Sequence, residues 1–112
     1  MQKDDAIRLQ HMLDAAREAM SFAQNKTRGS LDKNRQLELA LLKSIEIIGE
    51  AATRITDECR KNLSQIPWGN IIGMRNRLIH AYFDVNRDIL WKTVTEDLPP
   101  LISELENILD PK

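Results

Sequence analysis

Apolar residues recur at spacings of three and four along most of this chain, a pattern typical of helices that each bury one side. The first run covers about residues 4–24. Asp4 and Asp5 lie at its start, where acidic groups suit the positive end of a helix dipole. Turn-forming residues follow at 25–30. The run predicts a first helix whose buried side contains Leu9, Met12, Leu13, Ala16, Met20 and Ala23.

The second run has the clearest helical pattern and is apolar around more than half of its circumference. Leu39, Leu42 and Ile47 lie off its main stripe, so this helix should contact more than one neighbour and lie centrally in the fold. Its main stripe contains Leu37, Leu41, Ile45, Ile48, Ala52 and Ile55.

A third helix is predicted after the pattern breaks at residues 62–67. Pro67 can occupy the first turn of a helix, because its missing N–H would have no partner there. We expect this helix to run over about residues 68–83.

The fourth run begins after residues 84–86, which offer capping side chains. Because an interior proline removes a backbone hydrogen bond and clashes with the preceding turn, Pro99 and Pro100 predict a break or kink near residues 97–98. A short last helix over about 99–109 should follow. The apolar positions of this run are Leu90, Val94, Leu98, Leu101, Leu105 and Ile108.

These four runs predict an all-α fold, an antiparallel four- to five-helix up-and-down bundle that forms one domain over residues 1–112. The content of 42% hydrophobic and 29% charged residues is that of a globular protein. The formal net charge of -1 provides no global basic field, so any contact with nucleic acid must be local.

Cysteine and histidine are too sparse for a structural metal site. Cys59 is the only cysteine, which excludes an intramolecular disulfide, and His11 and His80 are the only histidines. The polar N-terminus and the lack of a long apolar run indicate a protein that neither enters nor crosses a membrane. We expect a soluble protein of the reducing cytoplasm.

The third predicted helix mixes polar residues with its apolar side, as the wall of a polar cleft would. At about 100° per residue, Arg75 and Tyr82 share one stripe of a helix that runs to residue 83, and Asn76 and His80 share the next. Arg77 should lie on the opposite, more exposed side.

These side chains suit phosphate chemistry. Arg75 can hold phosphate oxygens in a planar fork, Asn76 can donate a hydrogen bond or orient the histidine, and His80 can exchange a proton near neutral pH. RNA carries its own nucleophile, the 2′-hydroxyl, so its cleavage needs no metal in principle. Arg75 and His80 would lie about 140° apart on one helix, so we hypothesise a two-fold dimer in which the partner completes each site.

At these positions the chain resembles the HEPN superfamily, whose ribonucleases carry Arg, four residues, then His, often with a polar residue after the Arg. Arg75, Asn76 and His80 match this motif, and Tyr82 is similar to the tyrosine of the HepT toxins. The resemblance extends over nearly the whole chain, including residues 48–52, 67–68, 73–76 and 97–99.

The resemblance implies a dimeric, metal-independent endoribonuclease toxin without a cofactor, in which Arg75 and His80 are catalytic. It also implies a minimal nucleotidyltransferase antitoxin that transfers AMP to Tyr82. The added phosphate and nucleoside would then repel and block RNA.

Other interpretations of the same residues remain open. Arg75 and His80 could form structural ion pairs, Asn76 could act only as a cap, and Tyr82 could be a buried aromatic with a satisfied hydroxyl. The whole domain could be a non-catalytic partner that binds nucleotide or docks on a nucleotidyltransferase, or a purely structural helical dimer. Away from the motif, we expect packing roles for Trp68 and Trp91, an inert Cys59, an ordinary exposed His11, and a surface pair of Glu50 and Arg54 that alternatively lines the cleft.

Overall fold

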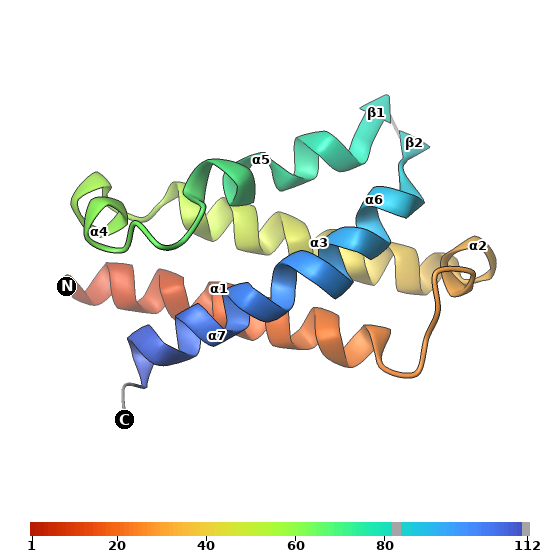
Figure 1. The fold of residues 1–112 in the computed structure, drawn as a ribbon. Coiled ribbons are helices and arrows are strands. Elements are labelled where there is room, and N and C mark those ends of the chain that lie inside the picture. Colours follow the sequence, from red (N-terminus) through yellow and green to blue (C-terminus); the bar gives the residue numbers. More distant parts are fainter. Residues whose placement is uncertain (82–83, 111–112) are drawn as a thin grey trace.

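The computed structural model describes residues 1–81 and 84–110, and for 79–81 it describes the backbone alone. The body of the molecule is an antiparallel helical bundle (Figure 1), as predicted. Its long helices are α1 (Lys3–Ala23), α3 (Arg35–Thr53), α5 (Trp68–Leu78) and α7 (Leu98–Leu109). Shorter elements connect them: α2 (Ser30–Lys33), α4 (Asp57–Asn62), the strands β1 (Ile79–Ala81) and β2 (Asp84–Val85), α6 (Arg87–Lys92) and a π-helical turn, η1 (Thr93–Asp97).

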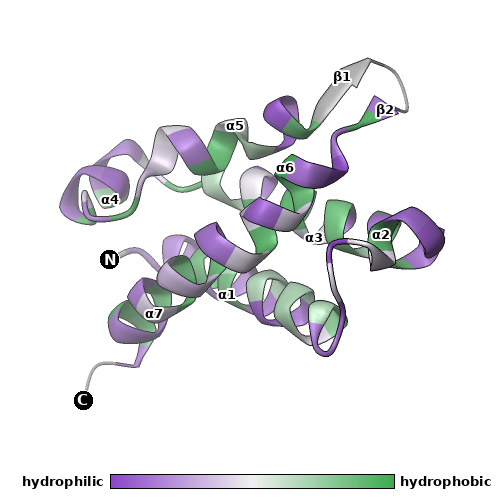
Figure 2. Ribbon diagram, turned by 45° about the vertical axis from the view of Figure 1, so that its right-hand side comes forward, coloured by the Kyte–Doolittle hydropathy of each residue, from purple (hydrophilic) through white to green (hydrophobic). Residues whose placement is uncertain are grey.

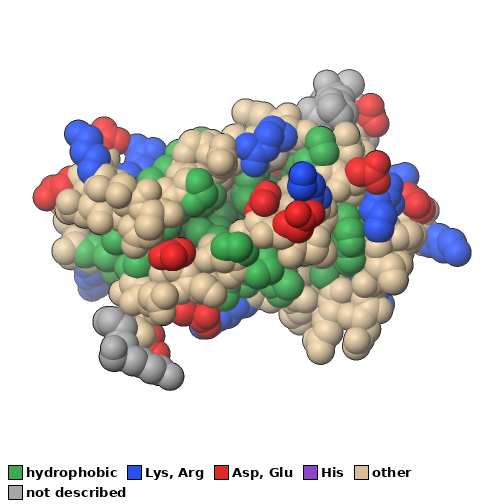
Figure 3. Space-filling view, in the orientation of Figure 1, with side chains coloured by type: hydrophobic (Ala, Val, Ile, Leu, Met, Phe, Trp, Pro, Cys, Tyr) green, Lys and Arg blue, Asp and Glu red, His purple; other side chains and the backbone are tan. Residues whose placement is uncertain are grey.

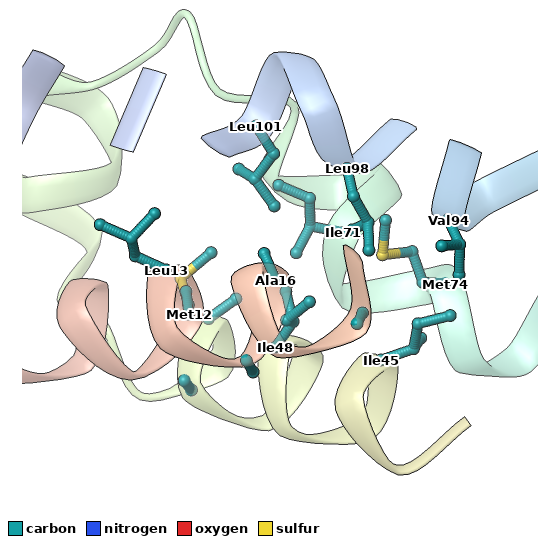
Figure 4. Close-up of a cluster of buried hydrophobic side chains, with 14 of the residues drawn as sticks. Met12, Leu13, Ala16, Ile45, Ile48, Ile71, Met74, Val94, Leu98 and Leu101 are labelled. Atoms are coloured by element: carbon teal, nitrogen blue, oxygen red, sulfur yellow. The ribbon is translucent and has the colours of Figure 1, made fainter. Parts of the chain in front are cut away.

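Helix α3 is central, because α1 packs against one of its sides and α5 against another. Helix α7 lies across α1 and closes the core (Figure 1). The apolar sides of the helices turn inward and their polar sides outward (Figure 2). Figure 4 shows side chains from all four long helices and from η1 meeting in one cluster: Met12, Leu13, Ala16, Ile45, Ile48, Ile71, Met74, Val94, Leu98 and Leu101.

Side chains at the helix starts explain where several elements begin. The Asn34 side chain accepts a hydrogen bond from the N–H of Leu37 at 3.0 Å and starts α3. The Asn86 side chain likewise accepts from the N–H of Ile89 at 3.0 Å and starts α6, so the predicted cap before the fourth run is confirmed at this residue.

The start of α4 depends on a residue of α1 that lies far away in the sequence. Asp5 of α1 is 2% exposed. It accepts hydrogen bonds from the N–H and the hydroxyl of Thr56 at 2.9 and 2.7 Å. Thr56 in turn caps α4 by accepting from the N–H of Cys59 at 3.2 Å. Asp5 thereby fixes the segment that leads from α3 into α5.

The prolines of the last run follow a local change in helix type, near the break or kink predicted at residues 97–98. Pro99 and Pro100 occupy the first turn of α7, where their missing N–H groups are tolerated. Just before them the chain widens into η1, and the N–H of Leu98 donates to the carbonyl of Thr93, five residues earlier. The chain therefore stays helical from Arg87 to Leu109, and one π-helical turn stands where a break was predicted.

The predicted extent of the third helix was wrong. Helix α5 ends at Leu78, and the chain continues in the short antiparallel pair β1–β2, in which Ile79 opposes Val85. The carbonyl of Leu78 accepts from the N–H of Asn86 at 2.7 Å, so the helical hydrogen-bond ladder does not continue through it. The angles derived for residues beyond 78 on a longer helix no longer apply.

Candidate active site

Arg75 lies in the last turn of α5, where its guanidinium is held against the neighbouring helix. Ile71, Met74 and Leu78 form the buried side of α5, and Arg75 stands at the edge of that side facing α3. Its Nε donates to Oε1 of Glu46 at 2.8 Å. The Arg75 side chain is 52% exposed and that of Glu46 30% exposed, so the arginine remains open to a ligand.

Asn76 and Arg77 are exposed as well, and Arg77 points to the other flank of α5. Its Nη2 donates to the carbonyl of Asn70 at 3.1 Å. This flank borders a cavity of about 630 Å³ between α5 and the α6–η1–α7 segment, with Ile71 and Met74 among its lining residues. Figure 3 shows apolar side chains at the bottom of this hollow. Arg75 does not line it, so the cavity and the arginine lie on different sides of α5.

The other two predicted site residues follow directly in the chain. His80 lies in β1, where the structure describes only the backbone, and Tyr82 lies outside the described residues. The structure thus exposes both Arg75 and Asn76 near the end of α5 and places the backbone of His80 in the adjoining strand. The roles predicted for the His80 and Tyr82 side chains stay predictions.

A buried carboxylate ties the exit of this strand pair to the central helix. Glu38 of α3 is 2% exposed. It accepts from Nε of Arg87 at 3.0 Å through Oε1 and from Nη1 of Arg35 at 3.2 Å through Oε2. Because Arg87 is the first residue of α6, this Glu38 cluster (Arg35, Glu38 and Arg87) anchors the chain just after β2.

A second ionic contact joins α6 to the turn before α2. Nε of Arg28 donates to Asp88 at 2.6 Å, and its Nη1 donates to Asp32 at 3.0 Å. Asp88 first and Asp32 second raise the pKa of the Arg28 guanidinium above its usual range. These contacts are solvent-exposed and therefore orient α6 more than they stabilise it.

The other residues considered in the sequence have structural roles, as expected. The indole N–H of Trp68 donates to the carbonyls of Arg60 and Leu63 at 3.2 and 3.1 Å, so this side chain is a packing anchor at the end of α4. Burial, and secondarily the negative charge of Asp5, raise the pKa of the Cys59 thiol, which leaves it a poor nucleophile.

The predicted surface pair is also present. Nη2 of Arg54 donates to Glu50 at 3.1 Å, and His11 is exposed beside them on a shallow hollow between α1 and α3. Trp91 is partly buried against the core. Within the described residues, no three histidine, cysteine or acidic side chains gather as metal ligands. In the same residues, no helix has the length and apolar character needed to cross a membrane.

Sequence reasoning missed Glu46 and Glu38, the two acidic residues that hold the site. Both lie on α3 beside the apolar stripe, and nothing in their local sequence distinguishes them from solvated surface residues. The available signal was weak: Arg35 stands three residues before Glu38, a spacing that allows an ion pair on one helix. The partners from α5 and α6 become visible only in the fold.

Comparison with known proteins assigns the chain to a family. The model of the family described as ribonuclease HepT-like matches residues 12–108, most of the chain and all of the elements that surround Arg75. The chain belongs to the HepT-like ribonuclease family. The expected relationship to HEPN ribonucleases of the HepT type is thereby confirmed.

Curated relatives agree with the HepT-like assignment. A "Putative RNase" of Methanocaldococcus jannaschii is 34% identical over 98 residues, covering 88% of this chain and 90% of the relative. A second "Putative RNase", from Caldanaerobacter subterraneus subsp. tengcongensis, is 43% identical over 77 residues, 69% of each chain. A "Probable ribonuclease HepT" of Thermococcus cleftensis is 40% identical over 75 residues, covering 67% of this chain and 68% of the relative. No solved structure matches the chain.

Proposed function

We propose that this chain is a metal-independent endoribonuclease, the toxin of a toxin–antitoxin pair, with Arg75 and His80 as its catalytic residues. The observation that carries the proposal is the placement of Arg75. This arginine is exposed in the last turn of α5, immediately before the strand that contains His80, in a member of a ribonuclease family. The relatives named as ribonucleases support the same reaction class.

The proposed reaction needs three events at one phosphate. His80 takes the proton of the 2′-hydroxyl, the 2′-oxygen attacks phosphorus, and the bond from phosphorus to the 5′-oxygen breaks as this oxygen takes a proton from water. The products are a 2′,3′-cyclic phosphate and a 5′-hydroxyl end. Arg75 stabilises the negative charge that builds on the phosphate oxygens, and exposed Asn76 donates a further hydrogen bond or orients His80.

We also propose that the active unit is a homodimer. The outer side of α5 carries Gly69 and Gly73. Apart from the backbone of α5 itself and the adjoining residues, a Cβ placed on either glycine would meet no atom of the described part of the chain within 4 Å. A second α5 can therefore approach this side closely, and two-fold symmetry would bring two copies of the Arg75 and His80 pair to one cleft. The argument for a dimer therefore rests on this open side of α5. It no longer rests on the angle between Arg75 and His80 on one helix, because α5 ends before His80.

Cleavage of a defined RNA in the presence of EDTA tests the proposed activity. The wild type should cut, whereas Arg75→Ala and His80→Ala should each lose roughly 10²-fold or more in rate, the usual contribution of a general acid–base group or charge-stabilising donor. Sequencing of the RNA ends would identify the sites cut. Unchanged rates in both variants would remove the proposed site, and no cleavage by the wild type freed of partners would favour a non-catalytic docking module.

Mixing the two inactive variants tests the dimer. If each site takes Arg75 from one subunit and His80 from the other, a mixed dimer of Arg75→Ala and His80→Ala retains one intact site. About a quarter of the wild-type activity should then return after random exchange of subunits. No recovery in samples shown by mass spectrometry to contain mixed dimers would place each site within one chain.

Regulation by a minimal nucleotidyltransferase antitoxin completes the proposal. Transfer of AMP from ATP to the hydroxyl of Tyr82, with release of pyrophosphate, would put a phosphate and a nucleoside two residues beyond His80. Mass spectrometry after incubation with the cognate antitoxin and ATP should locate AMP on Tyr82, with loss of RNA cleavage. AMP found only on other residues would reject this assignment.

A further inference from the structure

The contact between Glu46 and Arg75 joins two helices at the candidate site. Glu46 reaches from α3 to Arg75 on α5, 29 residues later in the chain, and Oε1 accepts from Nε at 2.8 Å. Among the residues that the structure describes, Glu46 is the only group that pairs with the guanidinium of Arg75. The contact is partly shielded, because the Glu46 side chain is 30% exposed.

The atom through which Arg75 is held determines which of its donors remain available. A guanidinium carries five N–H groups in a rigid plane, one on Nε and two on each Nη nitrogen. With the Nε–H directed at Glu46, the two Nη nitrogens remain unoccupied by described protein groups. These two nitrogens form the end-on edge of the plane, and that edge can donate two parallel hydrogen bonds to a phosphate.

We infer that Glu46 is a positioning residue that fixes the Arg75 guanidinium so that its Nη edge is presented to the RNA phosphate. The inference rests on the proposed function, since it assigns Glu46 a part in the same reaction. Arg75 has a long side chain that loses considerable rotamer freedom when it is ordered. Glu46 orders it before RNA binds, so less entropy is lost as the transition state forms.

Glu46 also affects the balance between binding and reaction. Its negative charge near Arg75 weakens the attraction of the site for any phosphate, bound substrate included. The transition state carries more negative charge on its phosphoryl oxygens than the bound substrate does, so this charge effect alone would slow the chemical step. The fixed position of the arginine acts in the opposite direction, and we expect it to dominate. Loss of Glu46 should therefore lower kcat more than it changes KM.

Glu50 provides a matched control. It lies on α3, one helical turn after Glu46, and its Oε1 accepts from Nη2 of Arg54 at 3.1 Å. This pair has similar chemistry and comparable length but involves no residue of α5. A general effect of removing an acidic residue from α3 should appear equally in Glu46→Ala and Glu50→Ala.

The first measurement does not depend on RNA cleavage. In ¹H–¹⁵N NMR spectra of the full chain, the Nε–H signal of Arg75 can be identified by its loss in Arg75→Lys. Glu46→Ala should shift this signal and speed its exchange with water several-fold, Glu46→Gln should have a smaller effect because the amide oxygen still accepts, and Glu50→Ala should leave it unchanged. An unchanged Arg75 signal in Glu46→Ala would overturn the inference.

The second measurement compares kinetic constants for a defined RNA. We expect Glu46→Ala to lower kcat about tenfold with KM changed less than about threefold, and Glu46→Gln to recover most of the loss, since misplacement of a catalytic group costs up to about 10²-fold. Glu50→Ala should match the wild type. A lower KM at constant kcat in Glu46→Ala would show that Glu46 merely shields Arg75, and would overturn the inference. If the wild type cuts no RNA, the proposed function fails, while the NMR comparison still decides whether Glu46 orders Arg75.

Discussion

Replacing Arg87 with alanine should loosen the β1–β2 pair, because Arg87 links the start of α6 to the buried carboxylate of Glu38. Two arginines donate to this carboxylate, one from a distant part of the chain and one from the same helix. Arg87 lies 49 residues from Glu38 in the chain and donates to Oε1 at 3.0 Å. Arg35 lies three residues away on the same helix and donates to Oε2 at 3.2 Å. Arg35→Ala is therefore a matched control that removes one donor without releasing α6.

The expected destabilisation follows from the burial of Glu38, which is 2% exposed. Removing both arginines would leave an uncompensated buried charge, a change that costs about 3–5 kcal/mol. With Arg35 still in place, Arg87→Ala should lower the free energy of unfolding by about 2 kcal/mol, the usual effect of one charged hydrogen bond. Arg35→Ala should cost less, about 1 kcal/mol, because the lost pair is local and Arg35 is largely exposed.

Urea denaturation would give the two stability changes, and hydrogen exchange would locate them. The N–H of Asn86 donates to the carbonyl of Leu78 at 2.7 Å and closes the base of the strand pair. Arg87→Ala should accelerate exchange of this amide more than Arg35→Ala does, and RNA cleavage should fall with it because His80 lies in β1. Equal exchange at Asn86 in both variants, or an Arg87→Ala protein as stable as the wild type, would refute the reasoning.

Three other substitutions have expected outcomes in thermal unfolding. Asp5→Asn should cost about 2 kcal/mol at pH 7, since a buried charged acceptor is lost. Hydrogen bonds from the backbone and then the hydroxyl of Thr56 hold the pKa of Asp5 below its ordinary value of 3.8. The difference in unfolding free energy between Asp5→Asn and the wild type should thus be present above about pH 4 and disappear as the pH falls through the lowered pKa. A constant difference down to about pH 2 would contradict this explanation. Gly49→Ala should be neutral or should stabilise the fold by up to about 1 kcal/mol. A Cβ at this position would lie 3.5 Å from the carbonyl oxygen of Ile71, which is an ordinary contact. A large loss of stability would show that the packing of α3 on α5 requires the glycine. Trp68→Phe should lower Tm by about 4–8 °C, since it removes the indole donor shared by the carbonyls of Arg60 and Leu63, which then keep only their backbone donors. An unchanged Tm would show that these backbone hydrogen bonds suffice.

The parts of the fold that could be predicted are those set by local sequence. The periodicity of the first run predicted about 4–24, and α1 covers Lys3–Ala23. The Asn86 cap and the place of the helix irregularity before Pro99 were also predicted, because a short acceptor side chain and a missing N–H act within a few residues. The family motif also indicated Arg75, which the fold then exposed at the end of α5.

The end of α5 could not be predicted, because it is decided outside the local pattern. Apolar residues continue at helical spacing past Leu78, so the sequence alone favoured a longer helix. The chain reverses instead where Asn86 bonds to Leu78 and Arg87 reaches Glu38, contacts between residues 8 and 49 positions apart. Glu46 was missed for the same reason, since its role depends on which helix packs beside α3.

The dependence of α4 on Asp5 has a consequence for the order of folding. The contact with Thr56 spans 51 residues, so the intervening chain must first be brought together by the packing of α1 on α3. Helix α4, at six residues, is too short to persist alone in water. It should consequently form late, after the transition state, and loss of the Asp5 contact should mainly speed unfolding and leave the folding rate nearly unchanged.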